Sequence, residues 1–205
     1  MRIIVLIHYT ENWQLLADIT VPILFKYANK HDYEVWVKRV PPYEKYTGIE
    51  KLSMIDTYLQ DGDIGLIMDA DTCITNFKIK IESFLEEGKD LYLSEGLNMG
   101  IFIIRYSSWS KAFIHMLIKS IESGQSNCEQ DAVELFMKHH KDDKIKVCSH
   151  PCFNSYLSEL YPDIPQPVTA EQGQWEQGQF ICHLPALSME TRIAKMKELK
   201  ERIVR

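Results

Sequence analysis

Two pairs of aspartates lie close together in this sequence, and a single residue separates the two members of each pair. Asp61 and Asp63 flank a glycine, and Asp69 and Asp71 flank an alanine. Carboxylates at this spacing can bind one divalent cation, and many enzymes that act on phosphates use such a pair. Because the pattern also arises by chance, the residues around each pair must decide whether it binds a metal.

A short apolar segment separates the two pairs. Its sequence, IGLIM at residues 64–68, is bounded by polar residues and predicts a buried strand of a parallel sheet. The first pair then lies where the chain enters the strand, and the second pair lies where the chain leaves it. Ligands of open α/β sheets bind outside the carboxyl ends of the strands. We therefore expect Asp69 and Asp71 to bind a metal, and we expect the first pair to form a solvated turn.

The composition indicates one domain without a basic surface. The 205 residues are 45% hydrophobic, and no linker or repeat divides them, so we expect a single domain over residues 1–205. A formal net charge of −6 gives no overall field that attracts nucleic acid or anionic membranes. The apolar run at residues 3–7 is too short for a signal peptide or a membrane span. We therefore expect a soluble, cytoplasmic protein with reduced cysteines and without a transmembrane segment.

The apolar patterns along the chain alternate between strands and helices. We expect strands at residues 3–7, 33–39, 64–68, 90–94, 99–104, 144–148 and 179–184, and helices at residues 15–32, 49–60, 79–87, 107–123, 128–140 and 188–204. Within the first helical region, Thr20 is expected to cap a segment that begins at Val21 and Pro22. The β-α-β-α-β opening predicts an α/β fold with a parallel, right-handed, doubly wound sheet. The residues that should line the crevice beside the second aspartate pair are His8, Tyr9 and Thr10.

Five segments, FKYANKHDYE, LIMDADTCITNF, NMGIFIIRYSSWS, EQDAVEL and FICHL, occur in this order along the chain. The ordered set resembles the GT-A glycosyltransferases, which use nucleotide sugars, and it is most similar to family 34, the α-galactosyl- and α-xylosyltransferases. In that family the corresponding segments read like Tyr-Ala-x-x-His-x-Tyr, Asp-x-Asp, Asn-x-Gly-x-Phe-x-x-Arg-x-Ser-x-Trp-Ser, Glu-Gln-x-Ala and a late His. The resemblance spans about residues 1–196. It implies a single GT-A (Rossmann-like) domain, with a mostly parallel central sheet flanked by helices.

The resemblance also implies a metal-bound donor. Asp69 and Asp71 would hold Mn²⁺, or alternatively Mg²⁺, against the diphosphate of a nucleotide sugar, and His183 would be a third ligand. Carboxylate, imidazole and phosphate oxygens suit Mn²⁺, and the ion neutralises charge on the departing nucleotide diphosphate. A UDP-sugar is the favoured donor, and a glycan is the expected acceptor. The alternative for His183 is a hydrogen-bonded structural histidine at the end of a strand.

Further residues are assigned to the donor by the same resemblance. The residues expected to contact the nucleotide sugar are His8, Tyr9, Thr10, Lys51, Asp69, Ala70, Asn98, Gly100 and Arg192. Asn98 offers both a donor and an acceptor to sugar hydroxyls, and Gly100 permits a ligand to approach the backbone closely, unless it is an ordinary turn glycine. This sequence departs from the family because it lacks the glycine and lysine that follow the late histidine. Arg192 or Lys195 is the candidate to neutralise the diphosphate in their place.

Glu129, Gln130 and Asp131 are the candidate catalytic residues. Carboxylates are favoured at a helix N-terminus whatever the function, but the resemblance places this segment beside the acceptor and the anomeric carbon. In a retaining mechanism, as in family 34, Gln130 or Asp131 would stabilise an oxocarbenium-like state, or the departing phosphate would itself deprotonate the acceptor. In an inverting mechanism, Asp131 or Glu129 would act as the general base. The sequence leaves both mechanisms open, and the resemblance favours retention.

Two other functions are alternatives to the glycosyltransferase. A phosphatase of the haloacid dehalogenase class also places Asp-x-Asp after a strand, but that strand comes first in its fold, and Cys73 stands here where a Thr or Val is expected. A non-catalytic module that binds nucleotide sugars is the second alternative. Turnover distinguishes this module from an enzyme, because only the enzyme releases nucleotide when the acceptor is present.

Overall fold

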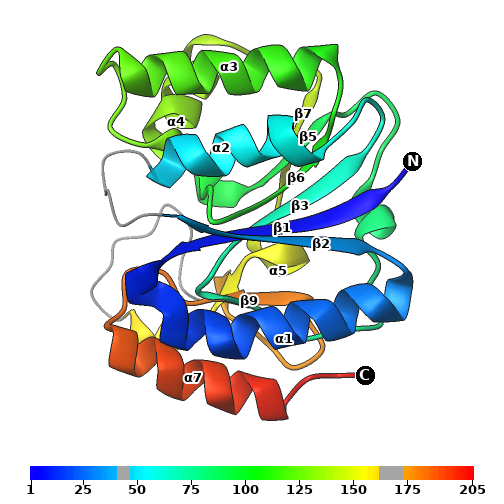
Figure 1. Ribbon diagram of the computed structural model, residues 1–205, viewed down its shortest axis with the longest axis vertical. Helices are drawn as coiled ribbons and strands as arrows, with labels where there is room; N and C mark the ends of the chain where they lie inside the picture. The colour runs from blue at the N-terminus through cyan, green and yellow to red at the C-terminus, as the bar shows by residue number, and fades with distance from the viewer. Residues whose placement is uncertain (41–46, 162–172) are drawn as a thin grey trace.

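A computed structural model of the chain describes residues 1–40, 47–161 and 173–205. A six-stranded sheet crosses the molecule, and helices cover both of its faces (Figure 1). One face is covered by α2 (Thr47–Tyr58), α3 (Ser108–Glu122) and α4 (Glu129–His139), and the other by α1 (Gln14–His31), against which α7 (Met189–Glu201) packs from outside. The short helices are η1 (Glu11–Trp13), η3 (Ile81–Phe84), η4 (Glu95–Leu97), α5 (His150–Phe153) and η5 (Ser158–Leu160).

The strands of the central sheet lie in the order β2-β1-β3-β6-β5-β7. Their bounds in that order are Glu34–Val40, Ile3–Thr10, Ile64–Asp69, Ile101–Arg105, Leu91–Ser94 and Ile145–Cys148. β6 runs antiparallel to both of its neighbours, β3 and β5, whereas the remaining neighbours pair in parallel. The predicted fold class, a mostly parallel sheet flanked by helices, is confirmed.

β1 and β3 lie side by side in the centre of this sheet, and their apolar side chains feed both cores. Val5 and Leu66 point into the cluster that packs against α1 and α7, whereas Ile4 and Ile67 point into the cluster that packs against α2, α3 and α4. A strand with apolar residues on both faces is typical of a sheet covered on both sides. Because the two strands are parallel, their carboxyl ends lie at the same edge of the sheet, with His8 opposite Asp69 and β1 continuing to Thr10.

A second, three-stranded sheet follows the acidic pair. It consists of β4 (Thr72–Ile74), β9 (Ile181–His183) and β8 (Ser155–Tyr156), in that order. His183 pairs with Thr72 across β4 and β9, and the Leu184 N–H donates to the carbonyl oxygen of Asp71 at 2.9 Å. This small sheet therefore brings a histidine from late in the chain to the second aspartate pair.

Two predicted helical features are wrong. Thr20 does not cap a helix, because α1 is continuous through Pro22 and the Thr20 hydroxyl donates to the carbonyl oxygen of Ala70 at 2.8 Å. The buried face of α1 continues on both sides of the proline, so packing stabilises the helix despite one missing donor. The helix expected at residues 79–87 is only the turn η3, in which Ile81 alone is buried, so no apolar stripe stabilises a longer helix.

The solvated turn expected at the first aspartate pair is correct for Asp61, which is exposed, and wrong for Asp63. Asp63 is 4% exposed, and its Oδ2 accepts hydrogen bonds from Arg2 Nη2 at 2.5 Å and from the Gln60 N–H at 2.8 Å. These contacts join the entry of β3 to the start of β1. Asp63 is therefore a structural residue of the sheet.

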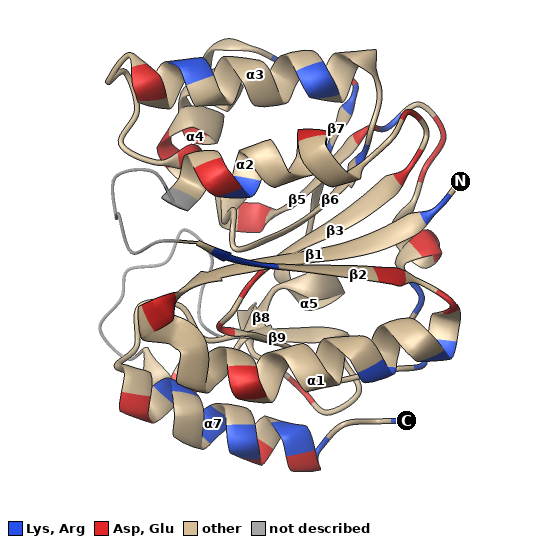
Figure 2. Cartoon of the chain, viewed as in Figure 1, with Lys and Arg blue, Asp and Glu red and all other residues tan. Residues whose placement is uncertain are grey.

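The charged residues show no large region of one sign on the helices that face outward. Along α7, acidic and basic residues are interspersed (Figure 2). Within the ranges that the structure describes, no helix has both the length and the apolar composition that a membrane span requires.

Candidate active site

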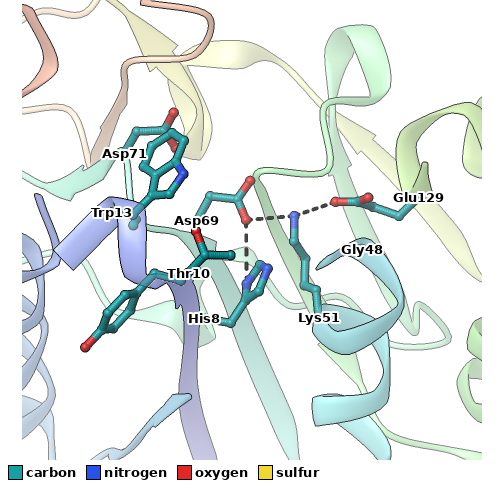
Figure 3. Close-up of a pocket in the computed structure, with 10 residues that line it drawn as sticks. His8, Thr10, Trp13, Gly48, Lys51, Asp69, Asp71 and Glu129 are labelled. Atoms are coloured by element: carbon teal, nitrogen blue, oxygen red, sulfur yellow. Dashed lines mark ion pairs between the residues drawn. The ribbon is translucent and has the colours of Figure 1, made fainter. Parts of the chain in front are cut away.

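A cavity of about 180 Å³ opens at the carboxyl edge of the sheet, where β1 and β3 end (Figure 3). The residues that line it are His8, Tyr9, Thr10, Trp13, Gly48, Lys51, Asp69, Ala70, Asp71 and Glu129. They come from the ends of β1 and β3, from η1, and from the first turns of α2 and α4. The structure thus brings together most of the residues that the sequence assigned to the donor. Asn98, Gly100 and Arg192 are not part of this lining.

Lys51 is the central cation of the cavity. Its ammonium nitrogen lies 2.7 Å from Asp69 Oδ1 and 2.6 Å from Glu129 Oε1, and it donates to the carbonyl oxygen of Met99 at 3.0 Å (Figure 3). The side chain is 4% exposed. Burial alone would lower the pKa of Lys51, but the two carboxylates outweigh burial and raise it. Lys51 is therefore a permanent charge that joins the acidic strand to α4.

Asp69 and His8 carry polar atoms that the fold does not fully use. Burial raises the pKa of Asp69 to about 6, although Lys51 opposes the shift. Burial likewise lowers the pKa of His8 to about 3, so its ring is neutral. Among the described residues, Asp69 Oδ1 has no hydrogen-bond partner beyond its ion pair with Lys51, and His8 Nδ1, 3.9 Å away, has none. An unpartnered buried atom such as Nδ1 of His8 is rare and often indicates an ion, water or ligand.

Asp71 and His183 face each other on the other side of the cavity mouth. His183 Nε2 lies 3.4 Å from Asp71 Oδ1, and Arg192 Nε lies 3.2 Å from Asp71 Oδ2. Burial alone would raise the pKa of Asp71, but His183 and Arg192 outweigh burial and lower it. Arg192 is fixed further by a 2.9 Å hydrogen bond to the carbonyl oxygen of Leu184.

These residues fit a metal ion with two protein ligands in place, Asp71 and His183. Within residues 1–40, 47–161 and 173–205, no three His, Cys, Asp or Glu side chains converge as a metal-binding group. The reason is visible in Figure 3, where the Asp69 carboxylate is turned toward Lys51 and away from Asp71. Asp69 could join the other two ligands only by loosening its ion pair with Lys51. The oxygen and imidazole donors suit Mn²⁺ or Mg²⁺.

Asn98 and Gly100 form a turn next to His183. A Cβ atom at residue 100 would lie 2.5 Å from Cε1 of His183, so the absence of a side chain gives room to the imidazole ring. The Gly100 N–H donates to Asn98 Oδ1 at 2.9 Å. The close approach expected at Gly100 is therefore made by a histidine of the same chain.

Of the three candidate catalytic residues, only Glu129 lines the cavity. The amide of Gln130 donates to Glu134 at 3.0 Å, and Asp131 accepts from the Asn127 side chain at 2.8 Å. Burial alone would raise the pKa of Glu129, but its pairing with Lys51 outweighs burial and lowers it. Glu129 is thus ionised and held at the cavity wall.

Sequence reasoning missed two residues of the cavity. A Cβ atom at Gly48 would lie 2.2 Å from Oε2 of Glu129, so only glycine leaves space for the carboxylate to reach Lys51. The ring of Trp13 lies under the guanidinium of Arg192, 4.5 Å from the centroid to Cζ. Both residues lie just before predicted helices, where the sequence pattern gives little information. The one signal for Trp13 is that it lies three residues after Thr10, which was expected to line the crevice.

No protein-family model and no curated protein sequence matches this chain. Its fold is similar to that of a glycosyltransferase involved in the glycosylation of the major capsid of PBCV-1, with a TM-score of 0.73 and 14% identity over 97% of this chain and 100% of the other. It is also similar to the galactosyltransferase LgtC in complex with donor and acceptor sugar analogs, with a TM-score of 0.60 and 13% identity over 98% of this chain and 96% of the other.

A third similar structure is the glycosyltransferase GlyE of Streptococcus pneumoniae TIGR4, in its apo form. Its TM-score is 0.62 and its identity is 14%, over 98% of this chain and 60% of the other. At such identities the likeness establishes the fold. The chain has the GT-A fold that its sequence predicts.

Proposed function

We propose that this protein is a glycosyltransferase that moves a sugar from a nucleotide-sugar donor to a hydroxyl group of a glycan acceptor. The observation that supports this best is the meeting of Asp71 and His183 beside a polar cavity at the carboxyl edge of a GT-A sheet. UDP-sugars are the favoured donors, because the sequence resembles family 34. The five free cysteines fit a reducing compartment, so we propose a cytoplasmic site of action.

The donor diphosphate would be held at the Asp71 side of the cavity. Asp71 and His183 would bind Mn²⁺ or Mg²⁺, joined by Asp69 when its ion pair with Lys51 loosens. When bound, the ion supplies positive charge against the leaving diphosphate. Arg192 adds a fixed cation, since Asp71 and Trp13 hold its guanidinium in one orientation. Arg192 is a better candidate than Lys195, which pairs with Glu198 on the surface.

The donor sugar would lie between Asp69 and α4. Glu129 faces this space, and we propose that it accepts hydrogen bonds from sugar hydroxyls while Lys51 holds it in place. Gln130 and Asp131 remain candidate catalytic residues. Each would first have to break a hydrogen bond, Gln130 with Glu134 and Asp131 with Asn127. We favour a retaining mechanism, because a carboxylate with a lowered pKa is a weak general base.

Product analysis tests the proposal. The protein is incubated with Mn²⁺, with each of a panel of UDP- and GDP-sugars, and with simple saccharides, and the products are identified by mass spectrometry. We expect slow donor hydrolysis alone and nucleotide release that is faster by orders of magnitude with the right acceptor, because water is poorly positioned in a site shaped for a sugar hydroxyl. Donor binding without turnover would favour a binding module. Phosphate release from a monoester, with no sugar transfer, would favour the phosphatase.

A further inference from the structure

The ring of His183 is held by two residues that lie outside the cavity lining. On one edge, Nδ1 lies 2.9 Å from Oδ1 of Asn154, the residue that ends α5. On the other edge, the absence of a side chain at Gly100 leaves room for the ring, because a Cβ atom there would lie 3.0 Å from Nε2. Asn154 is 0% exposed. The imidazole ring is therefore held in place, and within the described part of the chain Asn154 is the hydrogen-bond partner of Nδ1.

The two ends of the Asn154 amide face different partners in the structure. Its Nδ2 donates to the buried hydroxyl of Ser94 at 2.8 Å. Its backbone carbonyl oxygen lies 3.2 Å from Nδ1 of His150. With the amide nitrogen directed at Ser94, Oδ1 is the atom that faces His183, and an amide oxygen can only accept. The hydrogen between the two side chains consequently belongs to Nδ1 of the histidine.

We propose that Asn154 is a positioning residue that fixes the Nδ1–H tautomer of His183 and so directs the lone pair of Nε2 toward Asp71. The inference rests on the proposed function, because the proposed metal is what this lone pair would bind. Histidine ligands commonly donate their second N–H to a carbonyl or carboxylate, which sets the tautomer. Without Asn154, the opposite tautomer would place an N–H at Nε2, 3.4 Å from Asp71, and would block the metal.

The tautomer can be read directly in the metal-free protein by long-range ¹H–¹⁵N correlation spectra of the histidine rings. The spectra are recorded at about pH 8.5, two units above the ordinary imidazole pKa of about 6.5. We expect the Nδ1–H tautomer for His183 in the natural protein and in Asn154→Asp, which keeps the acceptor. Asn154→Leu should shift the ring toward Nε2–H and weaken Mn²⁺ binding about 10- to 100-fold by calorimetry, and Asn154→Asp should restore both.

Asn76→Leu is the matched control. Asn76 is also nearly buried and hydrogen-bonds to backbone, but its partners are Gly178 and Lys78, so its loss should leave the His183 tautomer and the Mn²⁺ affinity unchanged. An Nε2–H or doubly protonated ring in the natural protein would overturn the inference, as would natural Mn²⁺ affinity in a folded Asn154→Leu. If that variant does not fold, the natural spectrum and the Asn154→Asp affinity decide. If only the proposed function is wrong, the protein will have the expected tautomer and metal affinity but will transfer no sugar.

Discussion

The two ends of β3 carry the same Asp-x-Asp pattern, and the fold surrounds them differently. At the amino end, the side chain of Asp63 accepts hydrogen bonds from Arg2 and from the backbone of Gln60. At the carboxyl end, Asp69 is paired with Lys51, the nearby Nδ1 of His8 has no hydrogen-bond partner among the described residues, and Asp71 faces a histidine nitrogen. The amino end is complete within the chain, whereas the carboxyl end keeps capacity for a ligand. The Asp-x-Asp pattern alone therefore does not determine function. The hydrogen-bond donors around each pair determine whether its carboxylates can bind a ligand.

The pKa values of the two buried ends move in opposite directions. Burial alone would raise the pKa of Asp63, but hydrogen bonds from Arg2 and Gln60 outweigh burial and lower it. Burial raises the pKa of Asp69 to about 6 despite Lys51. An ionised carboxylate with a lowered pKa stabilises the folded state, whereas one with a raised pKa destabilises it. A carboxylate with a raised pKa that lines a cavity is typical of functional sites.

Removing Lys51, the cation at the carboxyl end of β3, should have the largest effect. Lys51→Met leaves the half-buried Asp69 and the nearly buried Glu129 without their common partner, so we expect a loss of about 2–3 kcal/mol in the free energy of unfolding, below the value for a fully buried pair. Urea titration measures it. Mn²⁺ should stabilise the variant more than the natural protein, because the ion replaces the missing charge near Asp69. Equal stabilisation of both by Mn²⁺ would show that Asp69 does not contact the ion.

Asp71→Asn should reduce acceptor-stimulated nucleotide release by about 100- to 1000-fold, as is typical when a charged group that stabilises a transition state is removed. The fold should persist, since Arg192 keeps its hydrogen bond to Leu184 and its contact with Trp13. Coupled UDP detection gives the rate, and circular dichroism gives the fold. Full affinity for Mn²⁺ and UDP in this variant would refute the ligand assignment.

The equivalent change at the amino end should affect stability and spare activity. Asp63→Asn places an amide NH₂ among donors, so we expect a loss of about 1–3 kcal/mol at neutral pH. Because the folded pKa of Asp63 is lowered, its contribution is present above the unfolded pKa of about 3.9 and is lost as pH falls through the folded value. The difference between variant and natural protein should therefore shrink below about pH 4. A constant difference across that range would show that ionisation of Asp63 plays no part.

Asp61→Asn should have the smallest effect. Asp61 is exposed, so the change in unfolding free energy should stay within about 0.5 kcal/mol, with unaltered nucleotide release. The same urea titration and UDP assay serve here. A large loss of activity would mean that both ends of β3 contribute to the reaction.

The sequence predicts the position of the site better than its contacts. The apolar run before Asp69 defines β3, and the general rule for α/β sheets then selects the carboxyl end. The strands of the smaller sheet have only two or three residues, which is too short for any periodicity, so the setting of His183 rests on resemblance alone. Asn154 lies beyond a four-residue helix and has no sequence signal at all.

Contacts between residues far apart in sequence account for most of the remaining differences. Lys51 was expected to bind the donor, and the structure pairs it with two carboxylates of the chain itself. Gly100 was expected to admit a ligand, and it admits the ring of His183. In both cases the residue type was informative, because a buried cation and a glycine each need a neighbour of a definite kind. The identity of that neighbour depends on the tertiary fold.

The ammonium group of Lys51 serves as an internal counterion for the acidic cavity. Chains whose clustered carboxylates rely on a metal cannot fold until the ion arrives, and chelators denature them. Here the fold supplies its own positive charge between Asp69 and Glu129, so we expect the chain to fold without a bound metal. Cells grown in metal-poor medium should accumulate the intact polypeptide in normal amounts. If turnover requires the proposed metal, scarcity of the ion would limit activity and leave protein abundance unchanged.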